Sequence, residues 1–466
     1  MQLFSRNRQP SPGIALAFFA GLLGSCLLGI LTRADHPLAV FWPTNALLLG
    51  WLLRQRRLAG PLGWTLAIAA YLAADLGTGS SLELTLHLTA ANFAGVAVGY
   101  VLLRRSPHFN RLLLGPAPVL TLFMGSIVAA LASALVALPA GSFLLGLDYG
   151  QTLAYWFSAE LVCYVTLLPV VLLAGSGQPF QPYRSAGALQ RWAPLASLAG
   201  SVGLGLLTGG PGALVFAMPA LLWCALAFPP RLTVSCVLVV CVGSLVGIAA
   251  GGFDIGLGQE PDLRDVVSLR LGVAMMAVAP LLVAAMNAAR ERMLKSLHHA
   301  AVHDALTATL SRAGFFQQAA ACLADQPRPL SALMIDVDHF KQINDRHGHA
   351  AGDHVLAELA LRLRTGLPDT ALLGRLGGEE FAVLLPGAER DSALALARVL
   401  CQRVDEEPFA LRPGLPPLAV SISVGVAVLD EDDGPAALDG LLQRADQALY
   451  RAKGSGRNRV VASTGD

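Results

Sequence analysis

The sequence predicts a polytopic α-helical membrane domain followed by a soluble α/β domain. Of its 466 residues, 54% are hydrophobic and only 14% are charged, and the mean hydropathy is +0.57. A soluble protein carries about 25% charged residues, so membrane-spanning segments are expected. The apolar bias stops near residue 290, and beyond it helical and strand patterns alternate among ordinary numbers of charged residues. The length fits two or three domains.

The N-terminal part contains ten apolar segments that could form spanning helices. A span needs about 20 mostly apolar residues; several segments are shorter, so eight or nine true spans would also fit. No small-residue cleavage site is followed by a soluble domain, which argues against a cleavable signal peptide. The segments are 13–31, 38–53, 62–77, 84–103, 116–138, 150–174, 194–207, 212–227, 233–251 and 267–287.

The charges of the connecting segments predict the topology. With the N-terminus inside, basic residues fall mainly in inside segments and acidic residues in outside ones, as the positive-inside rule requires. An even number of spans then places both termini in the cytoplasm, and only Arg33, Arg264 and Arg270 break the pattern. The inside residues are Arg6, Arg8, Arg54, Arg56, Arg57, Arg104, Arg105, Arg111, Arg184, Arg191, Arg231, Arg290, Arg292 and Lys295, and the outside ones are Asp35, Glu83, Asp148, Asp254, Glu260, Asp262 and Asp265.

A few polar residues lie within or beside the apolar segments. For Asp75, His87 and Asn92 we expect helix–helix hydrogen bonds or positions at the membrane interface. Glu160, in the middle of "WFSAELVCYV", is equally a candidate for ligand or signal sensing, because an intramembrane charge is costly. The seven cysteines form neither a CxxC pair nor a Cys/His cluster, so we expect them to pack as small apolar residues rather than bind metal.

A connector, "MNAARERMLKSLHHAAVHDALTATLSRAGFF" (286–316), follows the last apolar segment. Met286, Met293, Leu297 and Ala300 recur at intervals of seven, four and three residues, which predicts a short coiled-coil-like seam that continues the last span. The alternative is an amphipathic helix lying on its own domain. The predicted organisation is therefore a multi-span sensor domain over 1–287, a signalling linker over 288–305 and a soluble domain over 306–466.

The soluble domain mixes strands and helices in the order β-α-β-β-α-β. Apolar runs with branched residues predict strands, and amphipathic runs predict helices. Because "LGGEE" separates two short apolar runs, those runs are expected to form a hairpin. The expected strands are 330–338, 371–376, 381–386 and 418–429, and the expected helices are 351–367, 392–407 and 441–456.

The stretch "RLGGEEF" (375–381) places two glycines and two carboxylates at the predicted hairpin tip. Glycines let backbone amides approach an anion closely. Two carboxylates would repel that anion unless a hard cation lay between them, and such a cation takes further oxygen ligands. Asp336, at the end of the first strand, can supply one. The pattern predicts a Mg²⁺–nucleotide site; the alternative is an exposed acidic turn.

Three motifs in order carry a family resemblance. "IDVDHFKQINDRHGHAAGD" (335–353), "RLGGEEF" and "ALYRAKGSGRN" (448–458) closely resemble the GGDEF family of diguanylate cyclases, here in a GGEEF variant. The resemblance covers about 300–460 and implies a palm-like, nucleotidyl-cyclase-like fold that joins two GTP into cyclic di-GMP. "FWPTNALLLGWLLR" (41–54) and "LTAANFAGVAVGYVLLRR" (88–105) resemble bacterial membrane-associated sensor domains, which implies a bacterial inner membrane.

The resemblance also implies roles for individual residues. Metal ligands are expected to be oxygen groups around Mg²⁺ (or Mn²⁺), with Glu379 helping to deprotonate the attacking 3′-hydroxyl. We interpret Asp338 as a helix cap for "HFKQIN", His349 as a substrate neighbour or a local turn residue, and Glu380 as part of the motif without an assigned role. The implied residues are, for the metal, Asp336, the Val337 carbonyl and Glu379; for phosphates, Gly377, Gly378, Lys341, Lys453 and Arg457; for the guanine edge, Asn344 and Asp353; and for the apolar pocket walls, Phe340 and Leu356.

Two departures from the family pattern stand out. Ala308 and Ser311 replace the usual glycine and asparagine, at positions we expect to serve packing. The RxxD motif, through which many relatives bind the product, is replaced by residues 368–371, "PDTA". Lys453 and Arg457 lie four residues apart and would share a face if the last helix continued.

The expected reaction needs two GTP held head to tail, so we expect a two-fold homodimer. The expected partners are GTP, the membrane and a sensed ligand whose identity the sequence does not indicate, with no nucleic acid. Two alternatives stay open: a catalytically silent module that binds GTP or cyclic di-GMP, and a transporter with a regulatory tail.

Overall fold

The computed structural model describes residues 10–32, 41–144, 146–175, 188–210, 212–249, 262–325, 329–410, 416–429 and 437–463. The chain divides into two compact units, Met1–Arg292 and Met293–Asp466. Some of the charged residues used above to predict the topology lie outside the described residues or have side chains that are not described: Arg6, Arg8, Arg33, Asp35, Arg184, Arg191, Asp254 and Glu260.

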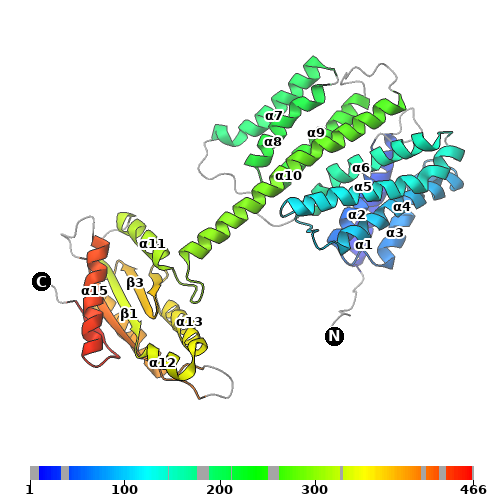
Figure 1. Ribbon diagram of the computed structural model, residues 1–466. Helices are drawn as coiled ribbons and strands as arrows, with labels where there is room; N and C mark the ends of the chain where they lie inside the picture. The colour runs from blue at the N-terminus through cyan, green and yellow to red at the C-terminus, as the bar shows by residue number, and fades with distance from the viewer. Residues whose placement is uncertain are drawn as a thin grey trace. The chain divides into compact units, whose positions relative to one another are not determined.

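The first unit is all-helical, and each of the ten apolar segments carries a helix (Figure 1). Six of the described helices are long and apolar enough to cross a membrane: α1, α4, α5 with the π-turn after it, α6, α9 and α10. The described parts of the other four helices are shorter or fall below that limit, so the described residues hold ten helices, six of which meet the criteria for a span. The helices are α1 Pro12–Leu31, α2 Thr44–Arg54, α3 Pro61–Gly77, α4 Leu82–Arg105, α5 Pro116–Pro139, α6 Tyr149–Leu173, α7 Ala188–Thr208, α8 Ala217–Ala227, α9 Pro230–Ala249 and α10 Leu263–Val302.

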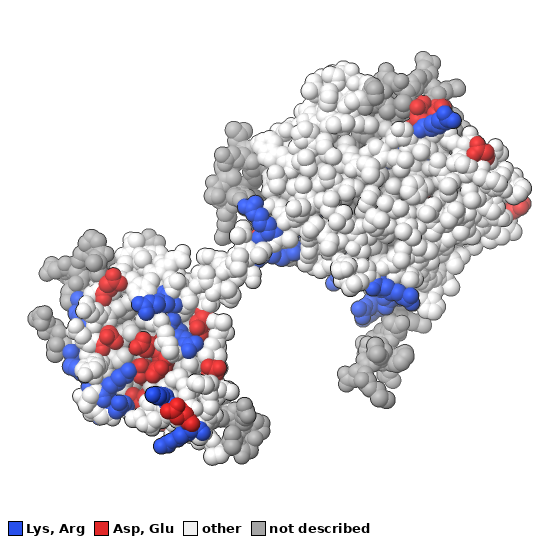
Figure 2. All heavy atoms as spheres, viewed as in Figure 1, with Lys and Arg blue, Asp and Glu red and all other residues white. Residues whose placement is uncertain are grey.

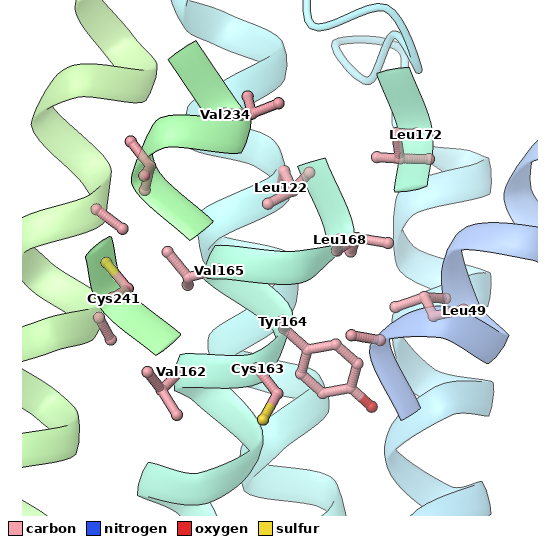
Figure 3. Packing of buried hydrophobic residues seen from close by; sticks show 14 of the residues in the cluster. Leu49, Leu122, Val162, Cys163, Tyr164, Val165, Leu168, Leu172, Val234 and Cys241 are labelled. Atoms are coloured by element: carbon pink, nitrogen blue, oxygen red, sulfur yellow. The ribbon is translucent and has the colours of Figure 1, made fainter. Parts of the chain in front are cut away.

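Helix α6 forms the centre of this unit. Of its apolar window, 78% is buried, against 28–44% in the other five long helices. Figure 3 shows Val162, Val165 and Leu168 on α6 among side chains of the surrounding helices. Charged side chains are nearly absent from the middle of the visible face and gather at the two ends of the unit (Figure 2). This distribution fits an apolar belt between two polar surfaces.

The polar residues singled out in the apolar segments differ in their surroundings. Asn92 accepts a hydrogen bond from Asn45 Nδ2 at 2.9 Å, which confirms a helix–helix contact, here between α2 and α4. Asp75 is also buried. His87 is exposed, and its Nδ1 lies 2.8 Å from the Glu83 carbonyl of the same helix. This contact is not a helix–helix bond, and the alternative for His87, a position at the membrane interface, stays a prediction.

Helix α10 is continuous over 40 residues and includes the predicted seam. The side chains of Met286, Met293 and Leu297 are 56%, 65% and 56% exposed. Such an open apolar stripe is a helix face that a second helix could cover.

The second unit is a five-stranded sheet between two helical layers, with strand order β2-β3-β1-β4-β5 (Figure 1). Helices α13 and α14 pack on one face, and α11 and α15 on the other. All eight residues of β1 are buried, which explains its continuous apolar run. The elements are α11 Arg312–Asp325, β1 Leu330–Val337, α12 Phe340–His347, α13 His349–Gly366, β2 Leu372–Gly377, β3 Glu380–Pro386, α14 Arg390–Glu406, β4 Ile422–Val428, α15 Ala437–Gly454 and β5 Val460–Ala462.

The predicted strands and helices of this unit are confirmed in type and order, including the β2–β3 hairpin. Two elements were missed: α11, and the three-residue strand β5, which pairs parallel with β4. The strand expected from residue 418 begins only at Ile422, because Leu418 instead pairs with Phe409 in an isolated bridge.

Candidate active site

The sheet brings the end of β1 against the hairpin tip. In the antiparallel β1–β3 pair, Asp336 lies directly opposite Glu380, and Glu379 precedes it in the turn. Gly378 has φ +51°, a left-handed conformation that favours glycine. A Cβ at either Gly377 or Gly378 would meet no atom within 4 Å, so the turn offers an open backbone surface on which a phosphate could lie.

Asp336 is a buried carboxyl group whose pKa is raised by its surroundings. Its side chain is only 7% exposed, and its Oδ2 lies 2.8 Å from Lys453 Nζ. Burial raises the pKa of Asp336 to about 6; Lys453 opposes this rise, and the charges of Glu379 and Glu380 add to it. The carboxyl groups of Asp336, Glu379 and Glu380 therefore lie close together with only the Lys453 ammonium beside them. A bound cation would offset this excess of negative charge.

The donor set fits a magnesium ion that also binds substrate. Among the described residues, no three His, Cys, Asp or Glu side chains lie close enough together to hold a metal unaided. Mg²⁺ characteristically binds through one or two carboxylates together with water and substrate phosphates. Asp336, Glu379 and the Val337 carbonyl match that requirement, and the buried, under-compensated Asp336 is the observation that favours it.

The predicted guanine-binding residues lie where α12 meets α13. A Cβ on Gly352 would come within 1.9 Å of Asn344 Oδ1 and 3.1 Å of the Phe340 ring, so a larger residue there would displace the Asn344 side chain. Asn344 Oδ1 is buried and has no hydrogen-bond partner among the described residues. Such an unsatisfied acceptor needs an explanation, and a ligand N–H group is one. Asp353 follows Gly352 and is exposed, whereas Leu356 is buried in the core below.

The predicted phosphate cations occupy different settings. Lys341 is exposed on α12, and His349 is exposed at the start of α13. Lys453 lies in the last turn of α15, where it pairs with Asp336. Arg457 does not share its helical face, because α15 ends at Gly454 and Arg457 has φ +62° in the following turn. The helix therefore does not continue far enough for Lys453 and Arg457 to share a face.

Asp338 is not a helix cap. Its two carboxylate oxygens accept hydrogen bonds from Ser421 Oγ and Ser423 Oγ, both at 2.7 Å, and from the Asn458 backbone N–H at 3.0 Å. The residue before α12 is His339, in the left-handed region at φ +58° and without a side-chain cap. Asp338 instead ties β1 to the start of β4 and to the segment that carries Arg457.

Arg375 and Asp304 form a contact that the sequence did not reveal. Arg375 donates to the Gly378 carbonyl from Nε at 2.9 Å and from Nη2 at 2.7 Å, and its Nη1 lies 3.2 Å from Asp304 Oδ1. Burial acts to raise the pKa of Asp304, but hydrogen bonds from Thr307 and the Arg375 guanidinium hold it below its usual range. The arginine thus connects the glycine turn to the segment just after α10.

The two departures near residue 310 have specific structural roles. Ala308 has φ +54°, so the usual glycine serves backbone conformation there and the packing interpretation is wrong. Ser311 Oγ accepts from the Gly314 N–H at 3.1 Å and donates to the Ala301 carbonyl at 2.6 Å, the behaviour of a helix cap, which an asparagine could share. The "PDTA" segment at 368–371 is a turn between α13 and β2.

Comparison with known proteins identifies the family. Residues 301–459 match the family model described as "Diguanylate cyclase, GGDEF domain". Over 448 residues the chain is 30% identical to "Probable diguanylate cyclase DgcF" of Escherichia coli O157:H7, covering 96% of this chain and 94% of the relative. It is also 41% identical over 181 residues to diguanylate cyclase DgcM of Escherichia coli K12, which covers 37% of this chain and 41% of that protein.

Solved structures resemble the second unit. A coiled coil and GGDEF domain of DgcB from Caulobacter crescentus, in complex with c-di-GMP, is 26% identical and covers 37% of this chain and 91% of that one, with TM-score 0.35. An active GGEEF domain from Vibrio cholerae is 37% identical, covering 33% and 94%, with TM-score 0.29. With a relative aligned over nearly its whole length, and with six helices able to cross a membrane, the chain belongs to the GGDEF family as a membrane-anchored diguanylate cyclase.

Proposed function

We propose that the protein condenses two GTP into cyclic di-GMP and two pyrophosphates at a Mg²⁺-dependent site around Asp336, under the control of its membrane domain. The observation that carries the site assignment is the buried Asp336 carboxyl, which lies beside two hairpin carboxyl groups and has a single lysine for compensation. Bound Mg²⁺ bridges phosphate oxygens and lowers the cost of the charge that develops on them.

On the phosphate side, we assign Asp336, Glu379 and the Val337 carbonyl to the metal, and the amides of Gly377 and Gly378 to the phosphates. Glu379 is also placed to help deprotonate the attacking 3′-hydroxyl. When a metal binds the Asp336 carboxylate, the Lys453 ammonium would leave its ion pair with Asp336 and bind a phosphate instead. Lys341 and Arg457, both exposed, supply further positive charge.

On the base side, we assign Asn344 and Asp353 to the guanine edge. A carboxylate and an amide oxygen both accept hydrogen bonds, and guanine offers N–H donors on the edge where adenine does not offer the same set. The unsatisfied Asn344 Oδ1 supports this role. Phe340 and Leu356 form the apolar floor beneath the base, and His349 lies at the rim.

The reaction requires two domains that face each other, because each site of this type holds one GTP. We infer a two-fold homodimer whose α10 helices associate along Met286, Met293, Leu297 and Ala300. Rotation of this pair would align or separate the two half-sites. Inserting one to seven residues after Met293 should therefore change activity periodically, since each residue turns a helix by about 100° and seven restore the seam. A steady decline with length would mean that α10 is only a tether.

We infer that the protein resides in a bacterial inner membrane with both termini cytoplasmic, as the distribution of its basic residues predicts. The residues on which this rests include several outside the described ranges, so reporter fusions at the two termini provide the test. Fusions active only outside the cytoplasm would reverse the topology.

The decisive assay uses the purified full-length protein with GTP and Mg²⁺ and measures cyclic di-GMP. Asp336→Asn should form no product while the membrane domain stays intact, and Asp345→Asn, an exposed position on α12, serves as its matched control. Tight GTP binding without any product from the wild type would instead indicate a silent binding module.

A further inference from the structure

A buried carboxyl lies in the core of the membrane unit. Glu160 is 3% exposed, in the most buried of the long helices, and its neighbours Leu161, Val162 and Cys163 are fully or almost fully buried. A charged group in such surroundings is expensive and is retained for a reason. One such reason is a binding site that uses the negative charge of the carboxyl or neutralises it when a ligand binds.

One oxygen of this carboxyl is held by a network from three other helices. Asn45 Nδ2, on α2, donates to Glu160 Oε1 at 2.5 Å and to Asn92 Oδ1 at 2.9 Å. The Tyr71 hydroxyl, from α3, donates to Asn45 Oδ1 at 2.6 Å. These bonds use both N–H groups and the carbonyl oxygen of the Asn45 amide, which holds Glu160 Oε1 in place.

The other oxygen has no such support. Glu160 Oε2 and the Tyr164 hydroxyl are both buried, and neither makes a well-formed hydrogen bond to a described residue; each is the other's nearest polar side-chain partner. They lie near each other, close enough to interact electrostatically, and Tyr164 reaches out of α6 toward the neighbouring helices (Figure 3). A Cβ on Gly95 of α4 would lie 2.9 Å from Ala129 O and Ser133 Cβ of α5 and 3.3 Å from the Tyr164 hydroxyl, so the glycine lets α5 and this hydroxyl both approach α4.

No described cationic side chain pairs with Glu160. The buried arginine of this unit, Arg270 on α10, places its guanidinium 4.2 Å from the centre of the Tyr155 ring and donates to the Tyr155 hydroxyl at 3.1 Å. Asp75 is also buried, and its carboxyl acts electrostatically on Tyr71 in the same direction as the Glu160 carboxyl does. Glu160 Oε2 and the Tyr164 hydroxyl oxygen therefore lie near each other between helices, and no cationic side chain among the described residues balances the carboxyl. A small positive species would interact favourably with both oxygens.

We propose that Glu160 and Tyr164 form an intramembrane binding site for an exchangeable monovalent cation, either a proton or an alkali cation such as Na⁺. Both would neutralise the carboxyl and use the free oxygens, and neither needs a large cavity. This assignment rests on the geometry of the membrane unit alone and does not depend on the proposed active-site roles.

The site can communicate with the helix that leads to the catalytic unit. Tyr155, which binds Arg270 of α10 through its ring and hydroxyl, lies on α6 a little over one turn from Glu160. Loss of the cation would leave an unpaired charge among α2, α4 and α6 and loosen their packing. The Tyr155–Arg270 contact would carry that change to α10, so the occupied and empty states of the site would favour different settings of α10.

The direct test is carbodiimide labelling of the full-length protein in lipid nanodiscs. The O–H of a protonated carboxyl adds across the N=C=N group of a carbodiimide to give an O-acylisourea. Its acyl group then moves from oxygen to nitrogen, which gives a stable N-acylurea that mass spectrometry can locate. Labelling of Glu160 should rise as the pH falls. Protection by Na⁺, compared with choline at equal ionic strength, identifies an alkali-cation site; insensitivity to Na⁺ with a clear pH dependence identifies a proton site.

Variants separate binding from a purely structural role. Glu160→Gln should lose the label, while Glu83→Gln, at an exposed position at the start of α4, should label as the wild type does. Tyr164→Phe removes the hydroxyl that lies beside the free oxygen of Glu160. The proposal predicts that protection then needs about tenfold more Na⁺, or that the pH midpoint of labelling falls by up to about one unit, because the bound cation has lost one of its two oxygens.

A second readout joins the site to signalling. Cyclic di-GMP formation by the wild type and by Glu83→Gln should respond to the cation that controls labelling, and Glu160→Gln should remove that response. Labelling of Glu160 that is absent at every pH, or constant in pH and Na⁺, overturns the proposal. Because labelling is read without GTP, it stands or falls separately from the active-site assignments.

Discussion

Replacing Asp336 by asparagine should stabilise the metal-free protein while abolishing its activity. The pKa of Asp336 rises from an ordinary value of 3.8 to about 6, chiefly because burial penalises the charged form. A group that binds its proton more tightly in the folded state makes the protein lose stability as the pH rises from about 4 to about 6. At 1.36 kcal/mol for each pH unit, the loss above pH 6 is about 3 kcal/mol.

Asparagine resembles the protonated carboxyl and stays neutral at every pH, so it avoids this loss. In urea unfolding of residues 293–466 without metal or nucleotide, wild type and Asp336→Asn should agree near pH 4. Above pH 6 the variant should be up to about 3 kcal/mol more stable, which corresponds to a melting temperature about 6–12 °C higher. Asp345→Asn, on the exposed side of α12, should show no such divergence with pH.

Adding Mg²⁺ and a non-hydrolysable GTP analogue should reverse the order. A ligand that binds only the folded state stabilises it, and wild type should gain this stabilisation while Asp336→Asn should not. If Asp336→Asn is instead the less stable protein at pH 7.5 without metal, the Lys453 ion pair outweighs the burial of the carboxylate. The reasoning about an under-compensated site would then be refuted.

Four further outcomes test the remaining assignments. Glu379→Gln should keep the fold and lower cyclic di-GMP formation at least about a hundredfold; near-normal turnover would exclude Glu379 from the reaction. Asp353→Ala should weaken GTP binding by about 1–3 kcal/mol in a direct binding assay, and unchanged affinity would show that the base pocket is misassigned. Ala308→Gly should raise the free energy of unfolding by up to about 1 kcal/mol, because it relieves a left-handed alanine; a lower urea midpoint would contradict this. Added cyclic di-GMP should inhibit only weakly, since residues 368–371 lack the charged pair and Arg375 already binds Asp304 and Gly378; tight inhibition that persists in Arg375→Ala would indicate another site.

The sequence predicted most of the catalytic fold because its signals are local. Fully buried strands appear as unbroken apolar runs, as in β1, and the glycine turn marks the hairpin between β2 and β3. Strand β5 carries no such signal, since it is three residues long and is defined by its pairing with β4. The start of β4 was misplaced for a related reason: an apolar residue such as Leu418 can pair outside the main sheet.

Side-chain partners far apart in the sequence were the harder part of the site. A carboxylate before a helix is usually a cap, yet Asp338 binds Ser421 and Ser423, more than eighty residues away in the chain. The Arg375–Asp304 pair joins segments 71 residues apart. Neither contact has a periodic or spacing signal, so only the assembled sheet reveals it. Asp336, by contrast, could be proposed from the sequence because it lies near the end of a predicted strand.

The end of α10 is built into the catalytic unit rather than loosely joined to it. The last residue of the helix, Val302, accepts a hydrogen bond from the Ser311 N–H at 2.7 Å, and the next but one, Asp304, binds Arg375. Arg375 in turn holds the Gly378 carbonyl with two donors. Gly314 also packs so closely on the Val302 carbonyl that a Cβ there would lie 2.1 Å from it. Because these contacts are closely packed, a displacement of the helix end is passed on to the residues that it touches. It reaches the turn proposed to hold the phosphates through one ion pair and one arginine, which makes the glycine turn the part of the active site most directly exposed to whatever α10 transmits.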